Sequence, residues 1–288
     1  MLTGEFEIDT FHNRNCIDAM HQIDDGIIDL TLTSPPYDGL RDYDGSIIDF
    51  NNDFKLIAKE LYRITKYGGV VVWVVGDETK DFCESLTSFK QAQFFVEKCK
   101  FKLLDTMIYY KQNYAPAYPT LRRYANQFEY MFVFSKGKPK TFNPIQVKKK
   151  EHSDGYSSFT QKDGSKIRKF VKRRKDTKDA SNVWSYAMGN KTIGHPAVFP
   201  EKLAEDHILS WSNKGDLILD PMCGSGTTCK MAKLSGRNFI GIDISKEYVE
   251  ISQKRISQDT LLPLAQNQQG GNGIPPNLKR SGILPKNI

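Results

Sequence analysis

The sequence predicts an α/β protein with a doubly wound, mostly parallel sheet. Short apolar segments alternate along the chain with segments of helical periodicity, as in successive β–α–β units. Several of the apolar segments end on proline, glycine or acidic residues, and ligands of open parallel sheets bind outside such carboxyl ends. The length of 288 residues allows one large domain that carries an insertion.

Each predicted strand combines an apolar run with a signal that ends it. The run 27–32 is followed by Pro35-Pro36, which cannot continue a hydrogen-bonded ladder. The run 70–75 is β-branched on both faces, as expected for a buried parallel strand. The other predicted strands are 101–110, 128–134, 216–220 and 238–243.

The predicted helices are amphipathic or capped. Apolar residues recur at helical spacing from Phe54 to Ile64, and the pair Gly68-Gly69 is expected to end that helix. Ser245 can cap the helix that follows the last strand. The remaining predicted helices are 88–99, 201–211 and 227–234.

Positive charge is concentrated in one part of the chain. The net charge is +7, but the segment 136–178 holds 15 Lys and Arg against four Asp and Glu, and the rest of the chain is net acidic. A basic block on an acidic body is typical of a polyanion-binding protein, although a solvated loop is the alternative. Aromatic residues are interleaved with these charges, which favours a binding segment over a purely solvated one. They are Phe142, Tyr156, Phe159, Phe170, Trp184 and Tyr186.

Composition excludes several classes of protein. No apolar run approaches the roughly 20 residues that a membrane helix needs. The first residues have neither the basic nor the apolar region of a secretory signal. The five cysteines are odd in number and widely spaced, which supports neither a disulfide framework nor a metal site. We therefore expect a cytoplasmic protein without a metal.

Composition also divides the chain. We expect the two halves of the main domain at 1–135 and 192–260, with the basic insertion between them at 136–191. The last segment, 261–288, is rich in Gln, Asn, Gly and Pro, and we expect it to be disordered.

A glycine-containing turn between a predicted strand and a predicted helix is the first motif that carries chemistry. It runs from Asp220 to Thr228, and its glycines let a ligand approach the backbone closely. No Gly-Lys-Ser/Thr follows, and the third glycine of the dinucleotide fingerprint is missing. Asp243 ends the next strand, where a carboxylate can accept from ribose hydroxyls. The motif indicates an adenosine ligand without phosphates; a tight structural turn is the alternative.

The second motif is Ser34-Pro35-Pro36-Tyr37, which also follows a strand. The prolines fix φ and remove two N–H donors, so the carbonyls of Ser34 and Pro35 can act as acceptors. Tyr37 offers an aromatic face beside them. This set suits a planar ligand with an exocyclic amino group, and a turn of purely structural role is the alternative.

Together, the two motifs resemble the catalytic and cofactor motifs of the amino-methylating DNA methyltransferases of restriction–modification systems. The order of catalytic motif, basic insertion and cofactor loop is similar to the β-class of that family, over about residues 8–258. The resemblance implies a seven-stranded, Rossmann-like methyltransferase sheet and S-adenosylmethionine as cofactor. It implies double-stranded DNA as substrate, a restriction endonuclease that acts separately, and either a monomer or a homodimer.

The resemblance also implies roles for particular residues. Asn15-Cys16-Ile17-Asp18 resembles the loop that borders the cofactor adenine, and the segment His195–Pro200 resembles a further cofactor segment. The expected catalytic residues are Ser34, Pro35, Pro36 and Tyr37. The expected cofactor-binding residues are Asn15, Cys16, Asp18, His195, Pro196, Phe199, Asp220, Pro221, Cys223, Gly224, Ser225, Gly226, Thr227, Thr228 and Asp243. Basic residues expected to contact DNA are Arg41, Arg122, Arg123, Lys148, Lys149, Lys150, Arg168, Lys169, Lys172, Arg173, Arg174 and Lys175.

The implied reaction needs no metal. The target base leaves the duplex, and its amino group donates to Ser34 and to the Pro35 carbonyl, which frees the nitrogen lone pair to attack the methyl group in line. Adenine enzymes of this family usually carry Asp where this chain has Ser34, and serine is more typical of cytosine-N4 methylation. We therefore expect cytosine N4 as the target, with adenine N6 as the alternative and an inactive DNA-binding module as the more remote one.

Overall fold

The computed structural model describes residues 2–3, 6–36, 49–114, 122–148, 154–172, 176–187 and 200–259. The described residues form two compact units. The larger unit contains those up to Asn143 and from Asn182 onward, and the smaller unit is Pro144–Ser181.

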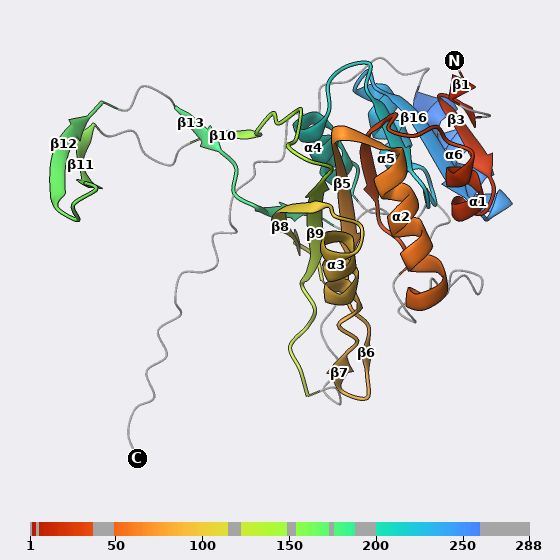
Figure 1. Cartoon of the computed structure of the whole chain (residues 1–288), viewed down its shortest axis with the longest axis horizontal. Helices are drawn as coiled ribbons and strands as arrows, with labels where there is room; N and C mark the ends of the chain where they lie inside the picture. Colours follow the sequence, from red (N-terminus) through yellow and green to blue (C-terminus); the bar gives the residue numbers. More distant parts are fainter. Residues whose placement is uncertain are drawn as a thin grey trace. The chain divides into compact units, whose positions relative to one another are not determined.

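A mixed sheet is the centre of the larger unit (Figure 1). Its strands are β3 (Thr10–Asn13), β4 (Ile28–Thr33), β5 (Thr65–Val75), β8 (Lys102–Lys111), β9 (Phe128–Ser135), β14 (Val183–Tyr186), β15 (Leu217–Asp220) and β16 (Asn238–Asp243). Their order across the sheet is β14-β8-β9-β5-β4-β15-β16-β3. Among the described strands of this sheet, β9 alone runs antiparallel to both of its neighbours. The predicted mostly parallel α/β fold is confirmed, with eight strands rather than seven.

Helices cover both faces of this sheet, so the fold is doubly wound. One face is covered by α1 (Cys16–His21), α2 (Lys55–Ile64) and α3 (Thr87–Glu97), and the other by α4 (Glu201–Trp211), α5 (Thr227–Leu234) and α6 (Lys246–Asp259). The alternation of side chains along a strand divides β5 between the two faces. Val71, Trp73 and Val75 belong to the core beneath α1–α3. Smaller elements are β1 (Leu2–Thr3), β2 (Phe6–Glu7), the π-helix Phe50–Phe54, β6 (Thr79–Lys80) and β7 (Cys83–Glu84).

The glycine pair does not end α2, and that prediction was wrong. The helix ends at Ile64, and β5 begins at once and runs through both glycines. Thr65 ends the helix instead, since its hydroxyl donates to the Leu61 carbonyl at 2.5 Å. A Cβ on Gly69 would lie 3.0 Å from the carbonyl oxygens of β4, so glycine here permits the close approach of β4 and β5.

The sheet also takes a strand from the segment 136–191, which the sequence indicated as an insertion. β14 pairs in parallel with β8, and Trp184 on it is buried with its ring 4.6 Å from that of His207. The Tyr186 hydroxyl donates to Asp206 of α4 at 2.6 Å. Four residues in a polar, basic context give too short a pattern to be recognised as a strand.

The smaller unit consists of antiparallel ribbons. β10 (Gln146–Lys148) pairs with β13 (Thr177–Asp179), and β11 (Gly155–Thr160) pairs with β12 (Lys166–Val171). The tail 261–288 lies outside the described residues. Among the described helices, none is long and apolar enough to cross a membrane.

A polar pair inside the aromatic core fixes how α3 packs on β5. The indole N–H of Trp73 donates to the Gln91 side chain at 2.8 Å, and both residues are buried. The rings of Phe54 and Phe95 meet the Trp73 ring edge-on at 5.8 and 5.3 Å. The indole N–H therefore depends on Gln91 as its acceptor.

We predict that Gln91→Ala lowers the free energy of unfolding by about 1–3 kcal/mol, because the buried indole N–H loses its acceptor. Urea unfolding followed by Trp fluorescence measures the change. Gln93→Ala, on an exposed position of the same helix, is the control and should change stability by less than about 0.5 kcal/mol. Equal stability of the two variants would contradict the role of Gln91.

Candidate active site

The carboxyl ends of four neighbouring strands converge at one edge of the sheet. β4, β15, β16 and β3 are parallel, so the segments that follow them lie on the same edge although they are far apart in sequence. Ser34 follows β4, the glycine-containing loop follows β15, Asp243 ends β16 and Asn15 comes just after β3. The sheet thus brings together the described members of both motifs and of the 15–18 loop.

The loop after β15 turns sharply at glycine. The Cys223 N–H donates to the Ile242 carbonyl of β16 at 2.9 Å, and the Gly226 N–H donates back to the Cys223 carbonyl at 2.7 Å. Gly226 has φ of +74°, and a Cβ there would lie 2.8 Å from Ser252. Glycine is required at this position for conformation and for space. Thr227 and Thr228 begin α5 immediately afterward.

Side chains behind the loop hold its shape. Ser252 of α6 donates to the Gly224 carbonyl at 2.8 Å. Arg255 of α6 donates to the carbonyl and, at 2.9 Å, to the hydroxyl of Ser225, and it pairs with Glu201 of α4 at 2.8 Å. The site residues predicted from the sequence did not include Ser252, Arg255 or Glu201. They carry no local signal, since each is ordinary in its own helix and meets the loop only in the folded chain.

Asp243 is tied directly to the loop. One of its carboxylate oxygens accepts from the Gly224 N–H at 2.7 Å and the other from the Ser245 N–H at 2.9 Å. Burial raises the pKa of Asp243, and these two hydrogen bonds oppose that shift. Each oxygen has a second lone pair, so the carboxylate can still accept from a ligand. It is partly exposed.

The 15–18 loop borders the same carboxylate. Burial and, to a smaller extent, the nearby charges of Asp53 and Asp243 raise the pKa of the Cys16 thiol to about 12, against the lowering effect of backbone hydrogen bonds at Cys16 and Ile17. The thiol therefore stays protonated and acts as an apolar wall. Asn15 is the N-cap of α1, so the segment 15–18, which was expected to be a loop, is the first turn of this helix; Asp18 lies exposed on it. Asp53, just before α2, is a further acid that the sequence analysis missed.

Asp220, the last residue of β15, connects this strand to the end of β4. Its carboxyl is 2% exposed, and burial raises its pKa to about 7, against the lowering effect of the Thr33 and Thr228 hydroxyls and the Met222 N–H. The Thr228 hydroxyl also donates to the Leu32 carbonyl of β4 at 3.1 Å. The strand β4, which Ser34 directly follows, is therefore held against the loop after β15.

The structure describes part of the catalytic turn. Pro35 is buried, and Ser34 and Pro36 are partly exposed at the end of β4. Five further predicted site residues lie outside the described residues; they are Tyr37, Arg41, His195, Pro196 and Phe199.

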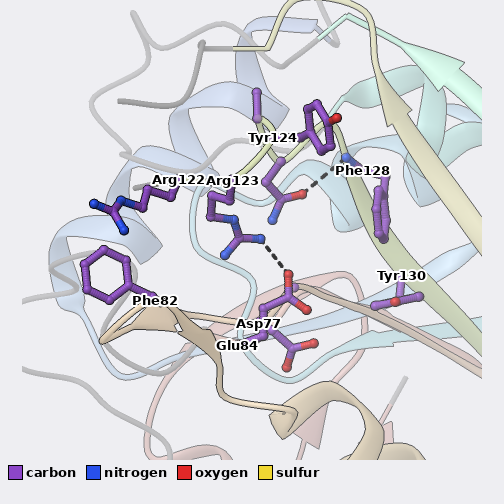
Figure 2. Close-up of a pocket in the computed structure, with 11 residues that line it drawn as sticks. Asp77, Phe82, Glu84, Arg122, Arg123, Tyr124, Phe128 and Tyr130 are labelled. Carbon is purple, nitrogen blue, oxygen red and sulfur yellow. Dashed lines mark hydrogen bonds and ion pairs between the residues drawn. The ribbon is translucent and has the colours of Figure 1, made fainter. Parts of the chain in front are cut away.

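A pocket of about 740 Å³ lies at the same edge, on the β5 side of β4 (Figure 2). Asp77, which follows β5, lines it, and both of its oxygens accept from Ser88, from the N–H at 2.9 Å and from the hydroxyl at 2.5 Å. Phe128 and Tyr130 of β9 form an aromatic wall, with ring centroids 5.3 Å apart. Other lining residues are Gly76, Phe82, Glu84, Arg122, Arg123, Tyr124, Ala125 and Asn126.

Two of the predicted DNA contacts, Arg122 and Arg123, thus line a pocket with aromatic residues. Arg123 donates to the Thr79 hydroxyl and pairs with Glu84 at 2.6 Å. The sequence analysis missed Asp77, although it directly follows an apolar strand, which is the signal that marked the other site residues.

The predicted DNA contacts of the smaller unit are exposed where the structure describes them. These are Lys148 on β10, Arg168 and Lys169 on β12, and Lys172. Lys149, Lys150, Arg173, Arg174 and Lys175 lie outside the described residues.

The raised pKa of Asp220 predicts a pH-dependent stability. The folded protein keeps this proton up to about pH 7, whereas an unfolded Asp releases it near pH 4, so ionisation destabilises the fold as pH rises across that interval. We expect Asp220→Asn to gain stability relative to the unsubstituted protein between pH 4 and pH 8, by about 4 kcal/mol at most. Urea unfolding at both pH values measures the difference. If the unfolding free energies of Asp220→Asn and of the unsubstituted protein differ by the same amount at both pH values, Asp220 ionises normally.

Comparison with known proteins agrees with this geometry. The family model described as DNA methylase matches residues 28–254. The orphan methyltransferase M.BamHII of Bacillus amyloliquefaciens is 48% identical over 254 residues, which cover 83% of this chain and 92% of the relative. The type II methyltransferase M.HpaI of Haemophilus parainfluenzae is 28% identical, over 85% of this chain and 73% of the relative.

Solved structures share the fold. The cytosine-N4-specific PvuII DNA methyltransferase superposes with a TM-score of 0.63 at 20% identity, over 85% of each chain. The complex of M1.HpyAVI with S-adenosylmethionine superposes with a TM-score of 0.54 at 23% identity, over 85% of this chain and 98% of the other. The family match spans most of the sequence and contains both strand-end motifs. The chain therefore belongs to the DNA methylase family of N6- and N4-amino methyltransferases, for which S-adenosylmethionine is the methyl donor.

Proposed function

We propose that this protein methylates the exocyclic N4 of a cytosine that is flipped out of double-stranded DNA at a specific site. The methyl donor is S-adenosylmethionine, and the modification protects host DNA in a restriction–modification system. The observation that carries the proposal is the position of Ser34. It lies at the end of β4, with the glycine-containing loop after β15 on one side and the pocket after β5 on the other.

The residues on the β15 side fit an adenosine-type cofactor that carries no phosphates. The Asp243 carboxylate is held in place by two N–H groups and has lone pairs left for ribose hydroxyls. Gly224 and Ser225 would line the methionine portion with backbone, and the protonated Cys16 would border the adenine. Asp53 and Asp243 make this side acidic, which suits a sulfonium cation. When bound, S-adenosylmethionine supplies an electrophilic methyl group.

Ser34 and Pro35 act on the other reactant. The Ser34 hydroxyl and the Pro35 carbonyl accept hydrogen bonds from the target amino group, which weakens its conjugation with the ring and frees its lone pair. Tyr37 stacks on the base. The pocket beside β5 exceeds the volume of one nucleobase, and its Phe128–Tyr130 wall offers an apolar surface for an extruded nucleotide.

The identity of the first residue of the turn supports cytosine over adenine. Ser34 presents a neutral hydroxyl where an adenine enzyme of this kind usually has a carboxylate. The fold similarity to a cytosine-N4-specific enzyme is compatible with this assignment. Adenine N6 is the second candidate.

Nucleoside mass spectrometry of DNA from cells that express the chain tests the function. We expect N4-methylcytosine, and its absence in cells that express the Ser34→Ala variant. Detection of N6-methyladenine in place of N4-methylcytosine would show that the target base is adenine. Absence of both marks, with DNA binding intact, would indicate an inactive DNA-binding module.

The basic segment 136–191 supplies the DNA contacts in this proposal. Exposed lysines of the smaller unit, such as Lys148, Lys169 and Lys172, neutralise phosphates in this proposal, so affinity should fall as salt rises. A restriction endonuclease that cleaves the same site would act as a separate protein, and one methyltransferase subunit or a homodimer would carry out the transfer.

Asp243→Ala should weaken S-adenosylmethionine binding about 10- to 100-fold, because hydrogen bonds to a carboxylate contribute roughly 1.5–3 kcal/mol. Isothermal titration calorimetry measures the affinity. The matched control is Asp216→Ala, since Asp216 also accepts from a backbone N–H, that of Asn213 at 2.7 Å, but precedes β15 at the opposite edge of the sheet. Unchanged affinity in the Asp243 variant would remove the ribose role.

Ser34→Ala should lower the single-turnover rate on saturating duplex and cofactor by about 10- to 100-fold, while cofactor affinity stays unchanged. Tyr37→Ala should lose a similar factor through lost stacking, and Tyr37→Phe should keep most activity. If Ser34 only shapes a turn, its alanine variant will melt earlier and still methylate at the normal rate. That outcome would end the amine-activation role.

A further inference from the structure

The ribbon of β11 and β12 presents two chemically different faces. Cross-strand partners of an antiparallel pair lie on the same face, so the observed register sorts the side chains. One face, which we call the Arg168 face, carries Tyr156, Ser158, Thr160, Lys166, Arg168 and Phe170. The opposite face, the Lys169 face, carries Gly155, Ser157, Phe159, Ile167, Lys169 and Val171.

The two faces also differ in exposure. Every member of the Arg168 face is exposed, including Tyr156 at 68% and Phe170 at 56%. On the Lys169 face, Ile167 and Val171 are partly buried. The rings of Tyr156 and Phe170 meet edge-on at 5.3 Å, which stiffens the Arg168 face. Exposed aromatic residues beside cations and hydroxyl groups indicate a surface that a partner covers.

The turn of the ribbon is fixed by its own side chains. The Asp163 carboxylate accepts from both the N–H and the hydroxyl of Ser165, at 2.9 and 2.7 Å, and these bonds lower the pKa of Asp163. Gly164 adopts φ of +84°, which the turn needs. The Gln161 N–H donates to the Ser165 carbonyl at 2.8 Å and closes the loop. These contacts fix the register of β11 and β12, the ribbon that Figure 1 shows.

We infer that the Arg168 face enters the major groove of duplex DNA and that Arg168 reads a guanine through its O6 and N7 atoms. The inference rests on the proposed function and names the side chain that sets base specificity. The major groove, about 12 Å wide, admits a two-stranded ribbon, and a guanidinium can contact both guanine acceptors at once. Duplex DNA is also the occupant that the charge favours, since Lys166 and Arg168 share this face.

The side chains next to Arg168 suit contact with base edges in the major groove better than contact with backbone phosphates. Ser158 lies directly opposite Arg168, and Thr160 lies opposite Lys166. Their hydroxyl groups can donate to or accept from base edges. Lys169 points to the other face, where a cation beside apolar residues can contact a phosphate at the groove rim. The two cations thus have separable roles, which variants can distinguish.

The test uses Arg168→Lys, which keeps the charge and removes the two-pronged contact. The recognition sequence is first determined by modification-detecting sequencing of DNA methylated by the full-length protein. Single-turnover methylation is then measured on duplexes in which each base pair is changed in turn. Discrimination at a base pair is the rate on the recognition sequence divided by the rate on the duplex in which that pair is changed. In Arg168→Lys, this ratio should fall about 5- to 150-fold at one G·C pair and stay the same at the others. 7-Deazaguanine at that pair should slow the unsubstituted protein and leave the variant unchanged.

Lys169→Gln is the matched control. It should weaken binding to all duplexes about equally and flatten the salt dependence, with discrimination unchanged. Discrimination that persists at every pair in Arg168→Lys would overturn the inference, as would its loss in Lys169→Gln alone. If the full-length protein methylates nothing, selection of bound duplexes from a random pool gives the same comparison, so failure of the catalytic proposal is distinguishable from failure of this one.

Discussion

The parallel pairing of β4, β15, β16 and β3 is the constraint on which the rest of the structure depends. Parallel strands have their carboxyl ends on the same edge, and each strand must be joined to the next by a helix that crosses a face of the sheet. Every described residue that follows one of these four strands is thereby brought to a single edge. A substitution that shifted one strand by a residue would move its side chains to the opposite face and separate the motifs.

Hydrogen bonds between neighbouring strand ends convert this alignment into a site. Asp243 accepts from Gly224, Cys223 donates to Ile242, and Thr228 donates to Leu32. Each bond connects two different strand ends, so the cofactor loop cannot move without the strand that carries Ser34. The same burial that excludes water from these contacts raises the pKa of Asp220 to about 7.

In the proposed function, methyl transfer and DNA recognition belong to different units of the chain. The larger unit holds the strand-end motifs and the aromatic pocket, and the smaller unit holds a ribbon whose faces differ in charge, hydrogen-bonding groups and exposure. A ribbon fixed by its own turn can vary its surface residues without disturbing the sheet.

The sequence by itself determined the class of fold and the family, and it located the two strand-end motifs, because each depends on local patterns. Apolar runs, proline pairs and glycine turns are readable over ten residues or fewer, and the family match bears out the resemblance they carry. The tertiary structure decided what depends on distant partners. It showed that Gly68-Gly69 lie inside β5, where β4 approaches closely, and that β14 belongs to the sheet. It also placed Arg255 behind the loop and Asp77 in a pocket, since both roles arise from contacts between segments that no local pattern connects.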